Sequence, residues 1–129
     1  MKKDIQNMAD VRLLVDSFYD RARKDALLGP VFEAAIGDRW DRHLDIMYRF
    51  WQTILLEEHT YTGNPFSKHA PLPLEKPHFE RWLSLFNQTT DELFEGPLAD
   101  EAKNRAFKMG HIFQVKLDYF RQSGKQPLV

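Results

Sequence analysis

The sequence predicts an all-α protein made of a single domain. In several long segments apolar residues recur at spacings of three and four, as on one face of a helix, and no segment alternates apolar and polar residues as a strand does. Gly and Pro cluster between these segments. The chain has 129 residues, which suits one domain, and its 43% hydrophobic and 13% aromatic residues are enough to build a core.

The first predicted helix runs from about Asn7 to Lys24, and its apolar positions share one face. Asn7, with Asp10 three residues later, is a typical helix start. Gly29-Pro30 is expected to end this region, and residues 31–36 to form a short turn-rich or one-turn helical piece.

The second predicted helix runs from about Arg39 to Glu57, with Asp38 as the expected N-cap because a short carboxylate can bond free amides of the first turn. Its apolar stripe includes Met47 and Trp51. From His59 to Pro77 the periodicity fails, and segments of this length inside compact domains are usually functional or disordered.

Two further helices are expected after that segment. The third follows Pro77, a residue well suited to the first turn of a helix, and reaches about Phe94. The last begins near Asp100 and reaches about Phe120. The prediction is therefore four principal helices with an irregular, proline-rich segment between the second and the third.

Composition excludes several classes of function. The net charge is −1 and charges are spread along the chain, so no basic tract indicates a nucleic-acid partner. No apolar run approaches the length of a membrane span, and no secretory leader is read at the start, so a cytoplasmic location without membrane attachment is expected. The absence of cysteine excludes disulfides, thiolate metal sites, iron–sulfur clusters and haem attached through Cys-x-x-Cys-His.

Two of the five histidines have unusual surroundings. His43 lies on the apolar side of the second predicted helix, where a histidine at the helix boundary with a satisfied ring is the simpler alternative. His69 lies in the irregular segment among prolines and apolar residues, which suits a ligand histidine that must hold one ring angle, although a surface-loop histidine is the alternative. Tyr19 and Trp82 are placed on inward helical faces, where their polar atoms would need either a backbone carbonyl or a bound ligand as a partner.

Over nearly its whole length the chain resembles the truncated haemoglobins, and within them group III. The order and spacing of several short fragments carry this resemblance, while the Gly-Gly pairs usual in groups I and II are missing. The fragments are Phe18-Tyr19, Leu28 to Phe32, Ala35-Ile36-Gly37, Trp40 to Trp51 with His43 inside, Tyr61-x-Gly63-x-Pro65 leading to Lys68-His69, and Phe79 to Leu83 followed by Leu85-Phe86.

This resemblance implies one truncated globin domain over residues 1–129, folded as a two-over-two helical sandwich around haem b. His69 matches the proximal ligand of a pentacoordinate iron. Lys68, beside that ligand, is either a partner of a haem propionate or an ordinary solvated lysine. Tyr19, His43 and Trp82 match the polar residues of the distal side, where His43 is either a third hydrogen-bond donor or a gate. The matching or neighbouring pocket walls are Phe32, Met47, Trp51 and Phe79.

Three functions remain open from the sequence. The first is a haemoglobin that binds, and in the simplest case transports, dioxygen or another small diatomic ligand such as nitric oxide or carbon monoxide. The second is an enzyme on the same haem, for nitric-oxide dioxygenation or peroxide turnover, which would need an external reductase because the chain carries no flavin or nicotinamide motif. The third is a haem-free helical interaction or sensor module.

Overall fold

The computed structural model describes residues 2–61 and 74–123, with side chains as far as residue 119. These residues form five α-helices and no strand. The helices are α1 (Met8–Lys24), α2 (Leu28–Ile36), α3 (Trp40–Leu55), α5 (Lys76–Leu93) and α6 (Pro97–Ser123). Within this part of the chain, each helix is too short or too polar to cross a membrane.

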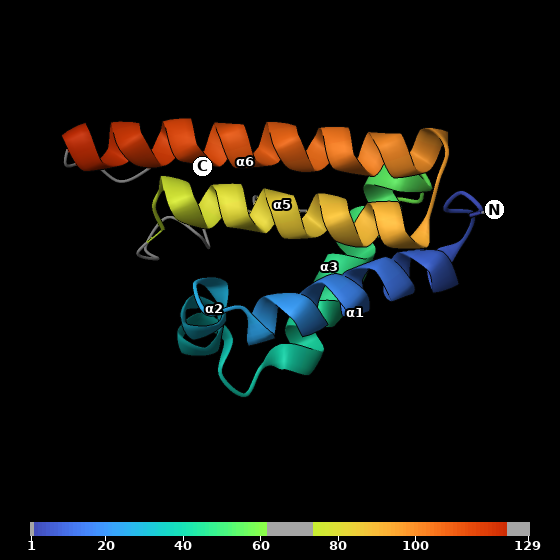
Figure 1. Ribbon diagram of the computed structural model, residues 1–129, viewed down its shortest axis with the longest axis horizontal. Helices are drawn as coiled ribbons and strands as arrows, with labels where there is room; N and C mark the ends of the chain where they lie inside the picture. The colour runs from blue at the N-terminus through green and yellow to red at the C-terminus, as the bar shows by residue number, and fades with distance from the viewer. Residues whose placement is uncertain (1, 62–73, 124–129) are drawn as a thin grey trace.

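The four long helices form two packed pairs. α5 and α6 run antiparallel side by side, and α1 and α3 pack against each other beside them (Figure 1). Contacts of α1 with α5 and of α3 with α6 join the two pairs, and α2 packs on α1 and α5. The arrangement confirms the all-α globin-like prediction and its four principal helices, and α2 is the short helical piece expected before the second of them.

Two predicted helix starts are confirmed. The Asn7 side chain accepts a hydrogen bond from the Asp10 amide at 3.1 Å and caps α1. Pro77 lies in the first turn of α5, where its missing N–H has no intrahelical role. Both signals are local, so they can be read from adjacent residues.

The prediction that Asp38 caps the second long helix is wrong. The N-cap is Arg39, without a side-chain capping bond. The connection to α2 is short, and Arg39 instead closes the preceding helix: its guanidinium donates to the carbonyls of Ala35 at 2.7 Å and Ile36 at 3.3 Å. Gly37, with a φ of 58°, makes this tight turn without the strain that a side chain would bring.

The expected break at Gly29-Pro30 is also wrong, because both residues lie in the first turn of α2. The chain turns earlier, at Asp25, whose carboxylate accepts from the amides of Leu27 at 3.1 Å and Leu28 at 3.0 Å. A side chain at Gly29 would place its Cβ 2.6 Å from the carbonyl oxygen of Arg23, so glycine here permits α2 to approach the end of α1.

The last helix begins at Pro97, three residues before Asp100, and is capped from far along the chain. The Asp4 carboxylate accepts from the amides of Leu98 and Ala99, each at 2.9 Å. Gly96, with a φ of 145°, packs closely against the Asp4 side chain. The N-terminal segment therefore completes the first turn of α6.

Candidate functional site

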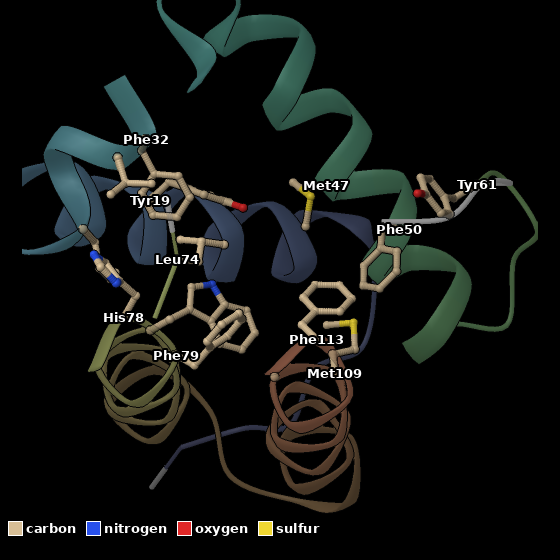
Figure 2. A pocket seen from close by; sticks show the side chains of 14 residues that line it. Tyr19, Phe32, Met47, Phe50, Tyr61, Leu74, His78, Phe79, Met109 and Phe113 are labelled. Carbon is tan, nitrogen blue, oxygen red and sulfur yellow. The ribbon is translucent and has the colours of Figure 1, made fainter. Parts of the chain in front are cut away.

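A largely apolar pocket lies between the helices. It holds about 840 Å³ of space, including its opening to solvent, and 14 described residues line it. They come from all five helices and from the segment between α3 and α5 (Figure 2). Five of the residues predicted from the sequence are among them: Tyr19, Phe32, Met47, Phe79 and Trp82.

Aromatic and sulfur-containing side chains converge on this space from three helices. Figure 2 shows Met47 on α3, Phe79 on α5 and Phe113 on α6 directed toward a common region. The lining residues in the described part of the chain include no Asp, Glu, Lys or Arg. Such a pocket suits a large, flat, mostly apolar ligand held by a small number of polar groups.

Tyr19 and His43 form the polar corner of the site. Tyr19 Oη lies 3.1 Å from His43 Nε2, and the two rings meet edge to face at 5.2 Å. Full burial raises the pKa of the Tyr19 phenol well above its ordinary value, because the anion would lose its hydration. The hydroxyl is therefore a neutral group that can donate one hydrogen bond.

Trp82 is held on the pocket wall by aromatic neighbours. Its ring stacks on Phe86 at 5.7 Å with 16° between the planes, and meets Phe18 edge to face at 5.9 Å. Trp51 stacks on the same Phe86 at 5.1 Å. Trp51 is buried in the core and is absent from the described pocket lining, so it supports the wall from behind.

Two residues singled out in the sequence, Lys68 and His69, lie outside the described residues. The structure therefore neither joins them to the pocket nor separates them from it. In the described ranges, no group of three or more His, Cys, Asp or Glu side chains is arranged to hold a metal ion.

Sequence reasoning missed several lining residues. His78 is the most polar of them, and its Nδ1 accepts a hydrogen bond from the Glu75 amide at 3.0 Å. Its position in the first turn after Pro77 was a readable signal of this capping role. On α6, Met109 and Phe113 are four residues apart and hence share a face, which a periodicity count would have found. The other missed lining residues are Leu28, Val31, Phe50, Tyr61, Leu74 and Gly110.

Comparison with known proteins identifies relatives of this chain. Residues 4–116 match the family model of the bacterial-like globins. The chain is 34% identical over 121 residues to the group 3 truncated hemoglobin ctb of Campylobacter jejuni, a match that covers 91% of this chain and 95% of the relative. It is also 28% identical over 92 residues to the group 2 truncated hemoglobin YjbI of Bacillus subtilis, covering 67% of each protein.

A solved structure matches at the level of the fold. The crystal structure of a group III truncated hemoglobin from Campylobacter jejuni superposes with a TM-score of 0.83 and 34% sequence identity, over 91% of this chain and 95% of that one. The chain therefore belongs to the bacterial-like globin family, in the group III branch of the truncated haemoglobins.

Proposed function

We propose that this globin binds haem b in the pocket and holds a small diatomic ligand, in the first place dioxygen, on the side of Tyr19 and Trp82. The observation that carries the proposal is a pocket whose walls are apolar and aromatic, with the buried Tyr19 hydroxyl on one wall and the Trp82 indole on another. Family membership supports the cofactor, since the curated relatives are named as hemoglobins.

The described residues fit such a cofactor. Apolar and aromatic side chains line the pocket from several sides, and no Asp, Glu, Lys or Arg is among its described lining residues, which suits a flat, mostly apolar ring system. Phe32, Met47 and Phe79 are the proposed walls, and Lys68 is the proposed partner of a propionate. Haem held by one imidazole would supply an iron able to bind one further small ligand.

We assign the axial imidazole to His69, and the surroundings of the four described histidines support this choice. His78 accepts the Glu75 amide through Nδ1, so its neutral ring carries the proton on Nε2 and has no free lone pair there. His43 Nε2 faces the Tyr19 hydroxyl. His59 and His111 are exposed and do not line the pocket.

Tyr19 and Trp82 are the proposed hydrogen-bond donors to the bound diatomic ligand. A diatomic ligand that gains partial negative charge is stabilised by donors fixed in a dry pocket. Tyr19 has one hydroxyl proton and Trp82 can only donate, through its indole N–H. His43 stands beside Tyr19, as a third donor or as a gate.

A haemin titration tests the proposal. The purified protein is expected to take up one equivalent of haemin and to develop a Soret band. His69→Ala should weaken haem retention or abolish the native spectrum, with partial recovery on adding imidazole. The exposed His59→Ala and His111→Ala are the matched controls and should keep the spectrum, and His78→Ala, in the pocket lining, should keep the iron–imidazole bond. A protein that stays colourless contradicts haem binding, and loss of the iron–imidazole bond in any of these three variants would assign the ligand to another histidine.

Haem-based turnover is the second candidate, because two donors that hold a ligand also favour its activation. Nitric-oxide dioxygenation or peroxide turnover on this pocket would require electrons from an external reductase. Rate measurements with nitric oxide and with peroxide separate the two candidates: turnover that persists with a supplied reductant favours the enzyme, and stoichiometric binding alone favours the carrier.

A further inference from the structure

We propose that a series of aromatic rings carries electrons from Tyr61 to the pocket, so that an oxidising equivalent left there by a peroxide passes to Trp82, then to Trp51, and finally to the Tyr61 phenol. This inference rests on the proposed haem-binding function, which provides the reaction with peroxide. It adds a function that ligand binding does not require, namely the removal of oxidising equivalents that would otherwise damage the pocket.

The rings are in contact along the whole path. Trp82, on the pocket wall, stacks on Phe86 at 5.7 Å, and Phe86 stacks on Trp51 at 5.1 Å, with only 16° and 20° between the planes. Trp51 meets Phe50 edge to face at 5.4 Å, and Phe50 meets Tyr61 in the same way at 5.2 Å. Figure 2 shows Phe50 and Tyr61 together at one end of the pocket. Because electron transfer slows steeply with distance, a series without gaps favours it.

The order of ring types suits stepwise oxidation. Indole and phenol rings lose one electron more readily than phenyl rings, and here a single phenyl ring separates Trp82 from Trp51 and Trp51 from Tyr61. Hydrogen peroxide takes two electrons and two protons to become two molecules of water. Two Tyr61 phenols, from two protein molecules, supply them and become two neutral phenoxyl radicals. A one-electron donor such as ascorbate then returns an electron and a proton to each radical.

Tyr61 is suited to be the end of this path. Its backbone amide donates to Thr53 Oγ1 at 3.0 Å, which fixes the residue against the end of α3. Partial burial raises the pKa of the Tyr61 phenol, so the phenol keeps its proton until the ring is oxidised. Because the side chain is only half-buried, water can accept that proton and a small reductant can reach the ring.

A second series of rings leaves Trp82 but ends less favourably. It passes through Phe18 at 5.9 Å, then Tyr19 at 5.0 Å and Trp40 at 5.7 Å. The guanidinium of Arg23 lies over the Trp40 ring at 4.2 Å from its centroid. A fixed positive charge this close opposes the loss of an electron from the ring, so the first series is the favoured path.

Radical trapping tests the path in the haem-loaded protein. Hydrogen peroxide would be added in the presence of a nitroso spin trap, and mass spectrometry of peptides would locate the trapped radical. Tyr61 is expected to carry the label, with a tyrosyl signal in freeze-quenched electron paramagnetic resonance spectra. Tyr119 is the internal comparison, because its side chain is 60% exposed and freely diffusing radicals would reach it first.

Variants separate this path from other routes. Trp51→Phe keeps an aromatic ring but removes the intermediate indole, so it should lose most of the Tyr61 label. Trp40→Phe, in the second series, is the matched control and should keep the label. Tyr61→Phe should shift oxidation to Trp51, which also covers the case that Trp51→Phe folds poorly.

Three outcomes would overturn the proposal. Full labelling of Tyr61 in Trp51→Phe would mean direct oxidation from the pocket, which Tyr61 also lines. Labelling of Tyr119 in preference to Tyr61 would mean diffusing radicals. A haem-loaded protein that reacts with peroxide without forming a protein radical would exclude the path altogether.

A measurement without haem distinguishes failure of this inference from failure of the proposed function. Azide radicals, generated by pulse radiolysis, oxidise indole rings and become azide ions. In the purified protein, decay of the indole radical should accompany growth of a phenoxyl radical, at a rate independent of protein concentration. Tyr61→Phe should lose this growth and Tyr119→Phe should keep it. The opposite result would overturn the path even in a protein that takes up no haem.

Discussion

Two regions of this globin hold polar groups in contrasting states, the half-buried Asp4 carboxylate and the buried Tyr19 hydroxyl. Where the N-terminal segment meets α6, both oxygens of Asp4 accept backbone amides, those of Leu98 and Ala99 among them. In the pocket, the Tyr19 hydroxyl contacts His43 and retains capacity for one more bond.

This contrast distinguishes a polar group suited to stabilise the fold from one suited to bind a ligand. A carboxylate with both oxygens engaged and a backbone packed against it holds two chain segments together and has no room for a ligand. A hydroxyl that can form one more hydrogen bond beside a cavity costs the folded state little stability, and it gains that bond when a ligand arrives. Substitutions at the first region should change folding, and substitutions at the second should change ligand release.

The largest effect is expected from Gly96→Ala. A Cβ at this position would lie 2.6 Å from Asp4 Cγ, and the φ of 145° disfavours any L side chain. We expect a loss of about 2–3 kcal/mol in the free energy of unfolding, measured by urea denaturation.

Gly110→Ala is the matched control for this change. It lies in a helix, and among the residues that the structure describes its Cβ would meet only the Trp82 ring, at 4.0 Å. It should leave stability unchanged or raise it slightly, because alanine is the better helix former. Equal stability of the Gly96→Ala and Gly110→Ala variants would contradict the picture of a closely packed junction.

The next effect is expected at the pocket. Tyr19→Phe keeps the ring and removes only the hydroxyl, so the dioxygen dissociation rate should rise by about ten- to a hundredfold, since a hydrogen bond to a partly charged acceptor contributes roughly 1.5–3 kcal/mol. Flash photolysis or stopped flow measures it.

Trp82→Phe should also accelerate release, although it removes volume as well as a donor. Its effect should not add to that of Tyr19→Phe, because both donors address one ligand. Unchanged rates in both variants would show that the two side chains do not face the ligand.

The smallest effect concerns pH. Burial opposes ionisation of Asp25, but the Arg81 bond and the amides of Leu28 and Leu27 outweigh it and lower the pKa below 3.8. The folded state therefore releases this proton more readily than the unfolded state, so the contribution to stability is present above the unfolded pKa and is lost as pH falls through the folded pKa.

Asp25→Asn should accordingly flatten the loss of stability below about pH 4, by at most about 1 kcal/mol because Arg81 is partly exposed. Thermal melting across this acidic range checks it, with Asp20→Asn, an exposed partner of Lys24, as the control. An identical dependence of stability on acidic pH in Asp25→Asn and wild type would contradict a contribution from the Asp25–Arg81 ion pair.

The sequence predicted the parts of the fold that local signals determine. Helical periodicity gave the four long helices, and the short-range caps at Asn7 and Pro77 gave two of their starts. The wrong assignments, at Asp38 and Gly29-Pro30, concern the turns around α2. There the contacts of Arg39 and Asp25 decide where the helices begin, and a residue's preference for caps or breaks does not reveal those contacts.

The candidate site, too, was only partly predictable from the sequence. Tyr19 and Trp82 could be placed by their inward faces, but the contact of Tyr19 with His43 joins two helices and appears only in three dimensions. The cover that Arg23 forms over Trp40 likewise depends on the crossing of α1 and α3. The place of His78 in the first turn of a helix indicates a capping role, but its position on the pocket wall, where α2 packs beside α5, appears only in three dimensions.

The capping of α6 by Asp4 also bears on how the protein folds. The bonded residues are 94 and 95 positions apart in a chain of 129 residues, so most of the chain must be closed into a loop before the cap can form. Contacts of such high sequence separation are gained late, after local helices and their nearest partners. Substituting Asp4 should therefore speed unfolding and leave the folding rate almost unchanged, so this cap would govern how long the native state lasts once it is reached.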